Sequence, residues 1–149
     1  MLNRVEEATV VAKQAQAKGL DSTFGTVHYA IAFYREDTAE MARQLARFAG
    51  RPGEEDVLFA MEADTVAYSG HLGKAREFSR RAADSAERAG EKETAATYRA
   101  VSAFREALFG NVAIAREQTA VGKGGSSGRD LDYALALGLV YSGELNRRK

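Results

Sequence analysis

The chain has 149 residues, 45 % of them apolar, which is enough for one folded domain with a core of its own. Its 21 basic and 21 acidic residues cancel, so the molecule as a whole has no electrostatic attraction to nucleic acid or to an anionic membrane. The absence of cysteine excludes disulfides, thiolate metal sites and a cysteine nucleophile, and it fits a reducing compartment.

No segment has the pattern of a targeting or membrane-spanning sequence. The start, MLNRVEEATVVAKQ, carries charges and lacks the apolar stretch of a signal peptide. The longest runs without Asp, Glu, Lys or Arg start at Ser22 and Tyr133, and both are shorter than the roughly 20 apolar residues that cross a bilayer. We expect a cytoplasmic protein with no membrane partner and no nucleic-acid partner.

The composition favours helices throughout, because alanine is frequent, proline occurs once and no long run alternates between apolar and polar residues. We therefore predict an all-α fold in which short turns make chain neighbours antiparallel. Asp21 or Ser22 should cap the second helix, and Thr38 the third. Gly19 and Gly90 should end the first and fifth helices. The eight predicted helices cover about residues 3–18, 22–34, 38–48, 54–68, 74–89, 93–109, 112–122 and 129–141.

One turn sequence recurs along the chain. A helix ends on a large residue and a turn residue, a polar and an apolar residue follow, and a small residue starts the packed stripe of the next helix. Ala75 and Ala115 hold this small position five residues after the turn glycine, and Ala82 repeats its role two turns later. The four turn residues are Glu36, Gly70, Gly110 and Gly143, with separations of 34, 40 and 33 residues.

This pattern resembles the tetratricopeptide repeat (TPR) family over nearly the whole chain. The small residue in the first helix of each family repeat corresponds to Ala63, Ala103 and Ala136, with Tyr29 in the divergent first copy. The family's tryptophan is absent, and its place is taken by Gly25, Phe59, Arg99 and Asp132. The resemblance implies an α-solenoid of antiparallel helix pairs, about eight helices in all, which coil into a right-handed superhelix.

By the same resemblance the chain is a single TPR-like domain that starts and stops out of phase with its repeats. The repeats cover about residues 22–50, 54–90 and 93–122, with half repeats at 3–19 and 129–143. The stretch from Gly70 to Asn111 also looks like TPR regions that follow Ser/Thr kinase domains in soil bacteria, although the chain has none of the kinase motifs. We therefore expect a fragment of a longer protein, the regulatory part that follows its kinase domain.

The residues that carry common enzyme chemistry form no recognisable site. His28 and His71 are the only histidines, too few for a zinc site, and we expect a packed or surface role for the first and a turn role for the second. Ser126 lies in a G-x-S-x-G pattern, but a predicted helix precedes it where a nucleophile elbow needs a strand. Glu54 and Glu55 should be exposed at a helix start, where they favour the helix dipole. We predict a protein that is not an enzyme and uses no metal or cofactor.

The glycine-rich stretch VGKGGSSGRD, residues 121–130, does not make a phosphate-binding loop. A P-loop needs G-x-x-x-x-G-K-[ST], but Gly124 follows Lys123, and Glu117 stands where the first glycine belongs. We predict instead that the seventh helix ends at Gly122 and that this stretch is a mobile hinge before the last helix.

The resemblance also implies where a partner would bind, because TPR proteins hold peptides in a concave groove lined by the first helix of each repeat. Tyr34, Tyr68 and Tyr141 each stand two residues before a turn residue, and Leu108 holds this place in the third repeat. The alternative is that these tyrosines pack between repeats. The predicted partner-binding residues are Tyr34, Asp64, Tyr68, Phe104, Leu108, Tyr133 and Tyr141.

Two functions follow from this interpretation. The first is a non-catalytic interaction or scaffold module that binds a peptide or protein segment in its groove. The alternative is a structural or self-association segment whose exposed terminal helices pack against a homodimer partner or a preceding kinase domain. Arg76, Arg80 and Arg81 are expected on a solvated helix face rather than in a nucleic-acid patch.

Overall fold

The computed structural model describes residues 4–122, 137 and 140, and only the backbone of 21–24 and 120–122. Over this part the chain is all-α, without a strand. The seven predicted helices before residue 123 are confirmed to within about two residues at each end. They are α1 (Val5–Ala17), α2 (Asp21–Tyr34), α3 (Thr38–Phe48), α4 (Glu55–Tyr68), α5 (Leu72–Arg88), α6 (Lys92–Leu108) and α7 (Val112–Gly122).

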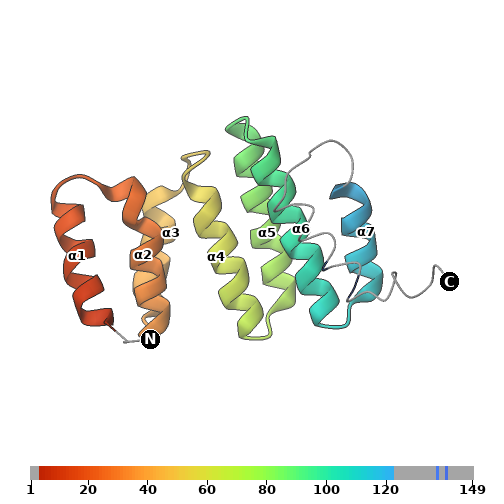
Figure 1. The fold of residues 1–149 in the computed structure, drawn as a ribbon, viewed down its shortest axis with the longest axis horizontal. Coiled ribbons are helices and arrows are strands. Elements are labelled where there is room, and N and C mark those ends of the chain that lie inside the picture. Colours follow the sequence, from red (N-terminus) through yellow and green to blue (C-terminus); the bar gives the residue numbers. More distant parts are fainter. Residues whose placement is uncertain (1–3, 123–136, 138–139, 141–149) are drawn as a thin grey trace.

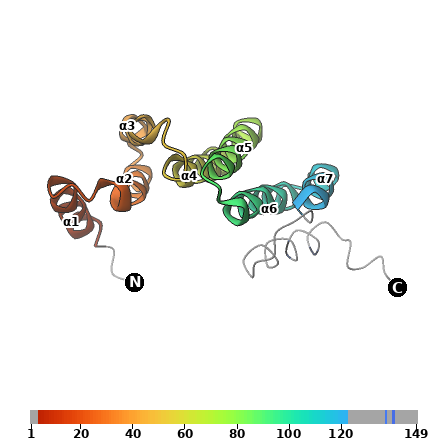
Figure 2. The same ribbon diagram turned by 90° about the horizontal axis from the view of Figure 1, so that it is seen from above.

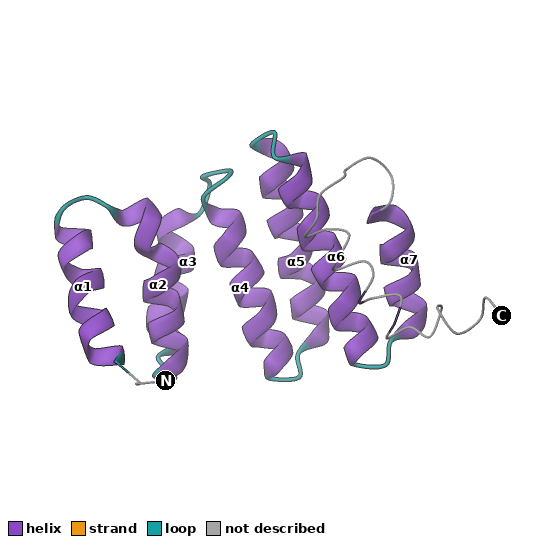
Figure 3. Ribbon diagram, viewed as in Figure 1, coloured by secondary structure: helices purple, strands orange, loops and turns teal. Residues whose placement is uncertain are grey.

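The helices stand side by side in a row and alternate in direction, joined by short turns at its two edges (Figures 1 and 3). Each helix packs on the next one along the chain, and α2 also packs on α4. Seen from above, α3, α5 and α7 form one staggered row and α2, α4 and α6 the other, with α1 beside α2 (Figure 2). The helices α2, α4 and α6 therefore all run in the same direction.

The aligned turn residues share one backbone conformation. Glu36, Gly70 and Gly110 have φ angles of 57°, 81° and 79°, in the left-handed region. In each case the next residue donates its N–H to a carbonyl five residues back, at 2.8–2.9 Å. This bond closes the end of the helix, as in a Schellman motif. Gly90, which is not one of the aligned turn residues, has a φ of 82° and the same kind of bond, from Glu91 N–H to the Ala86 carbonyl at 2.9 Å. The shared conformation therefore marks helix ends in general, and the repeat alignment stays a prediction. The fourth aligned residue, Gly143, lies outside the described residues.

Small residues fill the contacts between helices. Ala75, Ala82 and Ala115, at the predicted small positions, are all almost fully buried. Ala63 and Ala103 are fully buried in α4 and α6, as is Tyr29 at the equivalent place in α2. Near the start of the row, three larger side chains, Tyr29, Phe48 and Leu58, form an apolar cluster.

Gly25, in α2, leaves room for an aromatic ring from the next helix. A Cβ atom at position 25 would lie 2.5 Å from Cε2 of Phe48. The ring of Phe48, from α3, therefore covers the space above Gly25.

Two predicted helix caps were wrong. The N-cap of α3 is Asp37, whose side chain accepts the N–H of Glu40 at 2.9 Å, while Thr38 is already helical. The N-cap of α2 is Leu20, because the chain leaves α1 through the left-handed Gly19 and enters α2 at once. Gly19 and Gly90 end α1 and α5 as predicted, with φ angles of 74° and 82°.

The last part of the predicted organisation stays untested. The predicted helix 129–141 lies outside the described residues apart from Leu137 and Val140, and so does nearly all of the predicted hinge 121–130. The division into repeats and half repeats, and the inclusion in a longer protein, also remain predictions.

Candidate functional site

Large apolar side chains are exposed where α2, α4 and α6 end, at the lower edge of the row in Figure 1. Their exposed fractions range from 39 % to 83 %. Two of them meet, since the rings of Phe33 and Tyr68 lie edge to face with their centroids 5.9 Å apart. We call this set the aromatic edge; it consists of Phe33, Tyr34, Tyr68, Leu108 and Phe109.

The aromatic edge contains three of the seven predicted partner-binding residues: Tyr34, Tyr68 and Leu108. Phe104 is half-buried in α6. Tyr133 and Tyr141 lie outside the described residues. Phe33 and Phe109 flank the predicted positions. The TPR resemblance places Phe33 among the residues that line the groove beside Tyr34, whereas Phe109 was not predicted. The sequence does carry a signal for Phe109, because it is a large apolar residue next to the turn residue Gly110.

Asp64, another predicted site residue, has a structural contact. Its carboxylate pairs with Nη2 of the buried Arg105, whose Nη1 donates to Ser79 Oγ at 2.9 Å. Arg105 thus ties α6 to both α4 and α5. Because the side chain of Asp64 is otherwise exposed, it can still meet a partner, but changing it would also release a buried guanidinium.

Buried carboxylates also join α4, α5 and α6. Glu106 accepts two hydrogen bonds from Arg76, at 2.8 and 2.9 Å, and one from Asn111 Nδ2 at 2.8 Å. The bond to Glu106 raises the pKa of Arg76. Asp56 accepts the hydroxyl of Tyr98 at 2.7 Å, and burial followed by this bond raises the pKa of the phenol. These carboxylates hold the array together through donors on neighbouring helices.

Glu55 corrects a sequence prediction, because it is buried rather than exposed. It accepts hydrogen bonds from Gly50 N at 2.6 Å, Ser85 Oγ at 3.0 Å and Arg88 Nη2 at 2.9 Å. Burial alone would raise the pKa of Glu55, but these three bonds outweigh it and hold the pKa below its usual range. Glu54, in contrast, is exposed as predicted.

The predicted arginine face is only partly solvated. The guanidinium of Arg81 lies over the rings of Phe59 and Phe78, 4.1 and 5.1 Å from their centroids. Arg76 is engaged by Glu106, as described above. Arg80 has no hydrogen-bond or ion-pair partner within the described part of the chain. One of the three arginines therefore stays available on the surface.

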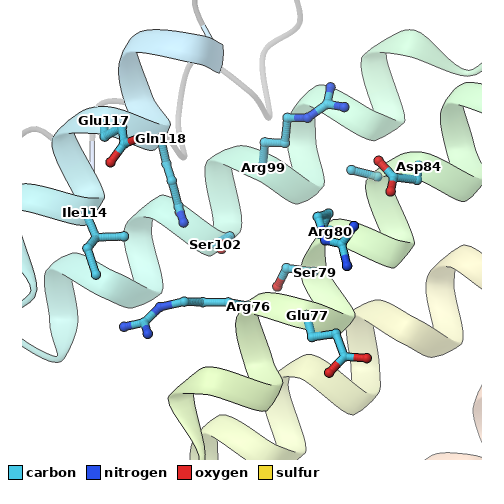
Figure 4. A pocket seen from close by; sticks show the side chains of 11 residues that line it. Arg76, Glu77, Ser79, Arg80, Asp84, Arg99, Ser102, Ile114, Glu117 and Gln118 are labelled. Atoms are coloured by element: carbon cyan, nitrogen blue, oxygen red, sulfur yellow. The ribbon is translucent and has the colours of Figure 1, made fainter.

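Two cavities lie between odd-numbered helices, away from the aromatic edge. One, of about 460 Å³, lies over α6 between α5 and α7; we call it the α5–α7 cavity (Figure 4). The other, of about 550 Å³, lies over α2 between α1 and α3, and we call it the α1–α3 cleft. None of the predicted partner-binding residues lines either one.

His28 lines the α1–α3 cleft, and His71 is the exposed N-cap of α5, in the turn where the sequence placed it. Within residues 4–122, no group of three or more His, Asp or Glu side chains is arranged to hold a metal ion. None of the described helices combines the length and the apolar character needed to cross a membrane.

Comparison with known proteins gives no relative from which a function could be transferred. The chain matches no protein-family model, no curated protein and no solved structure.

Proposed function

We propose that this protein is a non-catalytic interaction module that binds a segment of another protein along its aromatic edge. The observation that supports it most is the exposure of five large apolar side chains at the ends of three parallel helices. Exposed apolar side chains that gather in one region commonly mark protein-binding surfaces. The cost of leaving them in water is offset when a partner covers them.

The proposed architecture is a TPR-like α-solenoid with a right-handed superhelix. Its support is the shared left-handed conformation of Glu36, Gly70 and Gly110 together with the buried alanines five residues after two of them. In this architecture, the first helices of successive repeats run parallel and present their ends along one edge. A partner in an extended or helical conformation could then contact α2, α4 and α6 in turn.

The partner segment should carry apolar side chains at regular spacing. Tyr68 offers a broad ring face and a hydroxyl, and Phe33 supports that ring from α2. Aromatic anchors of this kind contribute most of the energy at many interfaces. We therefore expect Tyr68 to be the most sensitive position.

Site-specific crosslinking tests this proposal. Photoreactive benzoylphenylalanine in place of Tyr68 should crosslink a partner in cells that express the protein, whereas the same group in place of Val57 should not. Val57 is a suitable control because it is also exposed on α4 but lies at the other end of that helix. Once the partner is identified, Tyr34→Ser with Tyr68→Ser in the chain without the photoreactive group should abolish its pull-down while leaving the helical circular dichroism unchanged. Equal crosslinking from both positions would contradict the proposal.

Self-association is the second candidate, and one observation favours it. Val10 and Val11, adjacent on the first helix, are 54 % and 55 % exposed. A second copy that covers them would remove this apolar surface from water. Light scattering over a concentration series should then show a dimer that Val10→Ser with Val11→Ser dissociates. A wild-type chain that stays monomeric at every concentration would exclude this candidate.

A further inference from the structure

The α1–α3 cleft is more basic than the chain as a whole. It is bounded by α1, α2 and α3 and has a volume of about 550 Å³, within the usual range for small-molecule sites. Since the whole chain has no net charge, the excess of basic side chains here is local. The basic lining residues are Lys13, Arg35, Arg43 and Arg47, and the acidic ones are Asp37 and Glu40.

Both acidic residues in the cleft are already engaged. Asp37 caps α3 through the N–H of Glu40. Glu40 accepts hydrogen bonds from Gln44 Nε2 at 2.6 Å and from Arg43 Nε at 2.8 Å, and these bonds, the one from Gln44 first, hold its pKa below the usual range. Lys13, on the opposite wall, has no ion-pair or hydrogen-bond partner in the described part of the chain. Arg35 pairs with Glu6 at 2.8 Å and Arg43 pairs with Glu40, so Lys13 is the positive charge that the cleft offers to a ligand.

Two side chains that line the cleft each carry a buried polar atom without a partner among the described residues. Gln44 is only 5 % exposed, and its Oε1 has no hydrogen bond. Its amide orientation is fixed chemically, because Glu40 is a carboxylate and must face the nitrogen of the amide. The unpartnered oxygen accepts hydrogen bonds and cannot donate them. Nε2 of His28 is likewise buried and unpartnered.

Unsatisfied buried polar groups are costly, at about 1–3 kcal/mol each, so two in one cleft point to a ligand that satisfies them. Gln44 Oε1 needs a donor such as a hydroxyl group. His28 Nε2 can donate or accept, depending on its tautomer, and a second hydroxyl meets either need. No Phe, Tyr or Trp lines the cleft, so it offers no ring on which a nucleobase could stack.

The α5–α7 cavity is an internal comparison, since it occupies the same place two repeats later. Gln44 and Gln118 stand eight residues after the turn residues Glu36 and Gly110, and both have an unpartnered Oε1. Figure 4 shows Gln118 extending from α7 toward Ser102. The difference is charge, because three acidic residues balance three basic ones in this cavity. They are Glu77, Asp84 and Glu117 against Arg76, Arg80 and Arg99.

We propose that the α1–α3 cleft binds a small hydroxylated organic anion, such as a sugar phosphate or a sugar acid. The anionic group lies beside Lys13, and hydroxyl groups bond to Gln44 Oε1 and His28 Nε2 once these buried atoms turn toward the cleft. A neutral sugar would lack the contact with Lys13. An anion without hydroxyl groups would lack the contacts with Gln44 and His28. The site is separate from the aromatic edge, so it does not depend on the proposed interaction function.

Isothermal titration calorimetry at low salt tests the proposal on the purified full chain. The hydroxylated anions are glucose phosphate and gluconate. Glucose is the neutral comparison, inorganic phosphate the anion without a hydroxyl group, and an oligoglutamate peptide the macromolecular anion. At least one hydroxylated anion should bind about tenfold or more tightly than the three comparisons, because one charge-assisted contact or one satisfied buried acceptor each contributes about that factor.

Three variants locate the site. Lys13→Met should weaken the affinity about tenfold through loss of one charged contact. Since Lys13 has no partner among the described residues, this variant should fold normally. Gln44→Leu should weaken it by a similar factor through loss of the acceptor. Gln118→Leu, at the equivalent place in the α5–α7 cavity, should leave the affinity unchanged.

Several results would overturn this inference. Absence of binding by both hydroxylated anions would do so, as would binding that Lys13→Met leaves intact. Tighter binding of inorganic phosphate would show a plain anion site without the hydroxyl contacts. Tighter binding of oligoglutamate would show a protein-docking surface in place of a small-molecule site.

Discussion

At the scale of single residues, Glu36 is unusual because a non-glycine residue occupies a turn position that favours glycine. Its φ of 57° places a non-glycine residue in the left-handed region, where Gly70 and Gly110 stand in the equivalent turns. A side chain in this conformation costs about 1–2 kcal/mol. The turn forms nonetheless, because the Asp37 N–H to Ala32 bond at 2.9 Å and the Asp37 cap both support it.

Glu36→Gly should therefore stabilise the protein. After allowing for the greater freedom of glycine in the unfolded chain, we expect a gain of about 0.5–1 kcal/mol in the free energy of unfolding, measured by urea denaturation. Gly70→Ala is the matched control and should lose about 1 kcal/mol. No atom lies within 4 Å of the added Cβ at position 70, so the loss would come from the backbone alone. A destabilised Glu36→Gly variant would show that the Glu36 side chain has a role of its own.

Glu55 should make folding sensitive to acid. Because its pKa is lower in the folded chain than the ordinary value of 4.5, it stabilises the fold above that pH, and the contribution is lost as the pH falls through the folded value. Glu55→Gln should be less stable than wild type at pH 7 and should lose less stability on acidification below about 4.5. Urea denaturation at a series of pH values measures both effects.

The neighbouring Glu54 provides the control for this experiment. It is exposed and pairs only loosely with Arg51, at 3.6 Å. Glu54→Gln should change the free energy of unfolding at pH 7 by less than about 0.5 kcal/mol. Equal effects of the two substitutions would mean that the hydrogen bonds of Glu55 contribute nothing beyond its charge.

At the scale of helices, the contact between α2 and α3 depends on the absence of a side chain. Gly25 lies under the ring of Phe48, and the nearest two ring carbons would be 2.5 and 2.6 Å from an added Cβ. Alanine is the better helix former, by about 1 kcal/mol, so on an unobstructed helix this substitution would stabilise. At Gly25, the steric clash with the Phe48 ring should outweigh this gain in helix propensity.

Gly25→Ala should lower the free energy of unfolding by about 1–3 kcal/mol through overpacking. The ring of Phe48 is almost fully buried and cannot simply turn outward. Phe48→Leu alone should also destabilise, but combining it with Gly25→Ala should cost less than the sum of the two, because the smaller side chain makes room. Thermal unfolding of the four proteins measures this coupling, and strictly additive effects would refute the close contact.

The helices and turns could be predicted from the sequence because their signals are local. An alanine stands five residues after the turn glycine in two turns, so Gly70 with Ala75 could be recognised from the sequence alone. The burial of Glu55 could not be predicted, because an acidic residue at a helix start normally faces water. Its partners Ser85 and Arg88 lie thirty residues or more away in the sequence. The α1–α3 cleft was missed for the same reason, since three helices form it together.

At the scale of the whole molecule, the row of helices should be unevenly stable. The first helix packs chiefly on α2 and buries only Ala12 and Ala15, whereas α4 to α6 pack on neighbours at both sides and share buried ion pairs. In such linear arrays stability depends on nearest-neighbour contacts, so segments with few of them open first.

Hydrogen exchange measured by mass spectrometry should show this gradient. Amides of α1 should exchange well before those of α4, α5 and α6. Since Lys13 lies on α1 and also in the α1–α3 cleft, a bound anion should slow the exchange of α1 selectively. Uniform exchange across the helices would indicate a single cooperative unit instead.

The alternating direction of the helices has an electrostatic consequence for the aromatic edge. The C-terminal ends of α2, α4 and α6 lie there beside the N-terminal ends of α3, α5 and α7, which follow after short turns. Each helix carries a macrodipole with a partial charge of about −0.5 at its C-terminal end and about +0.5 at its N-terminal end, so the two kinds of end largely cancel along this edge. The rings should therefore select a partner by apolar contact and not by the sign of its charge. The affinity of that partner should change little as salt screens electrostatic interactions.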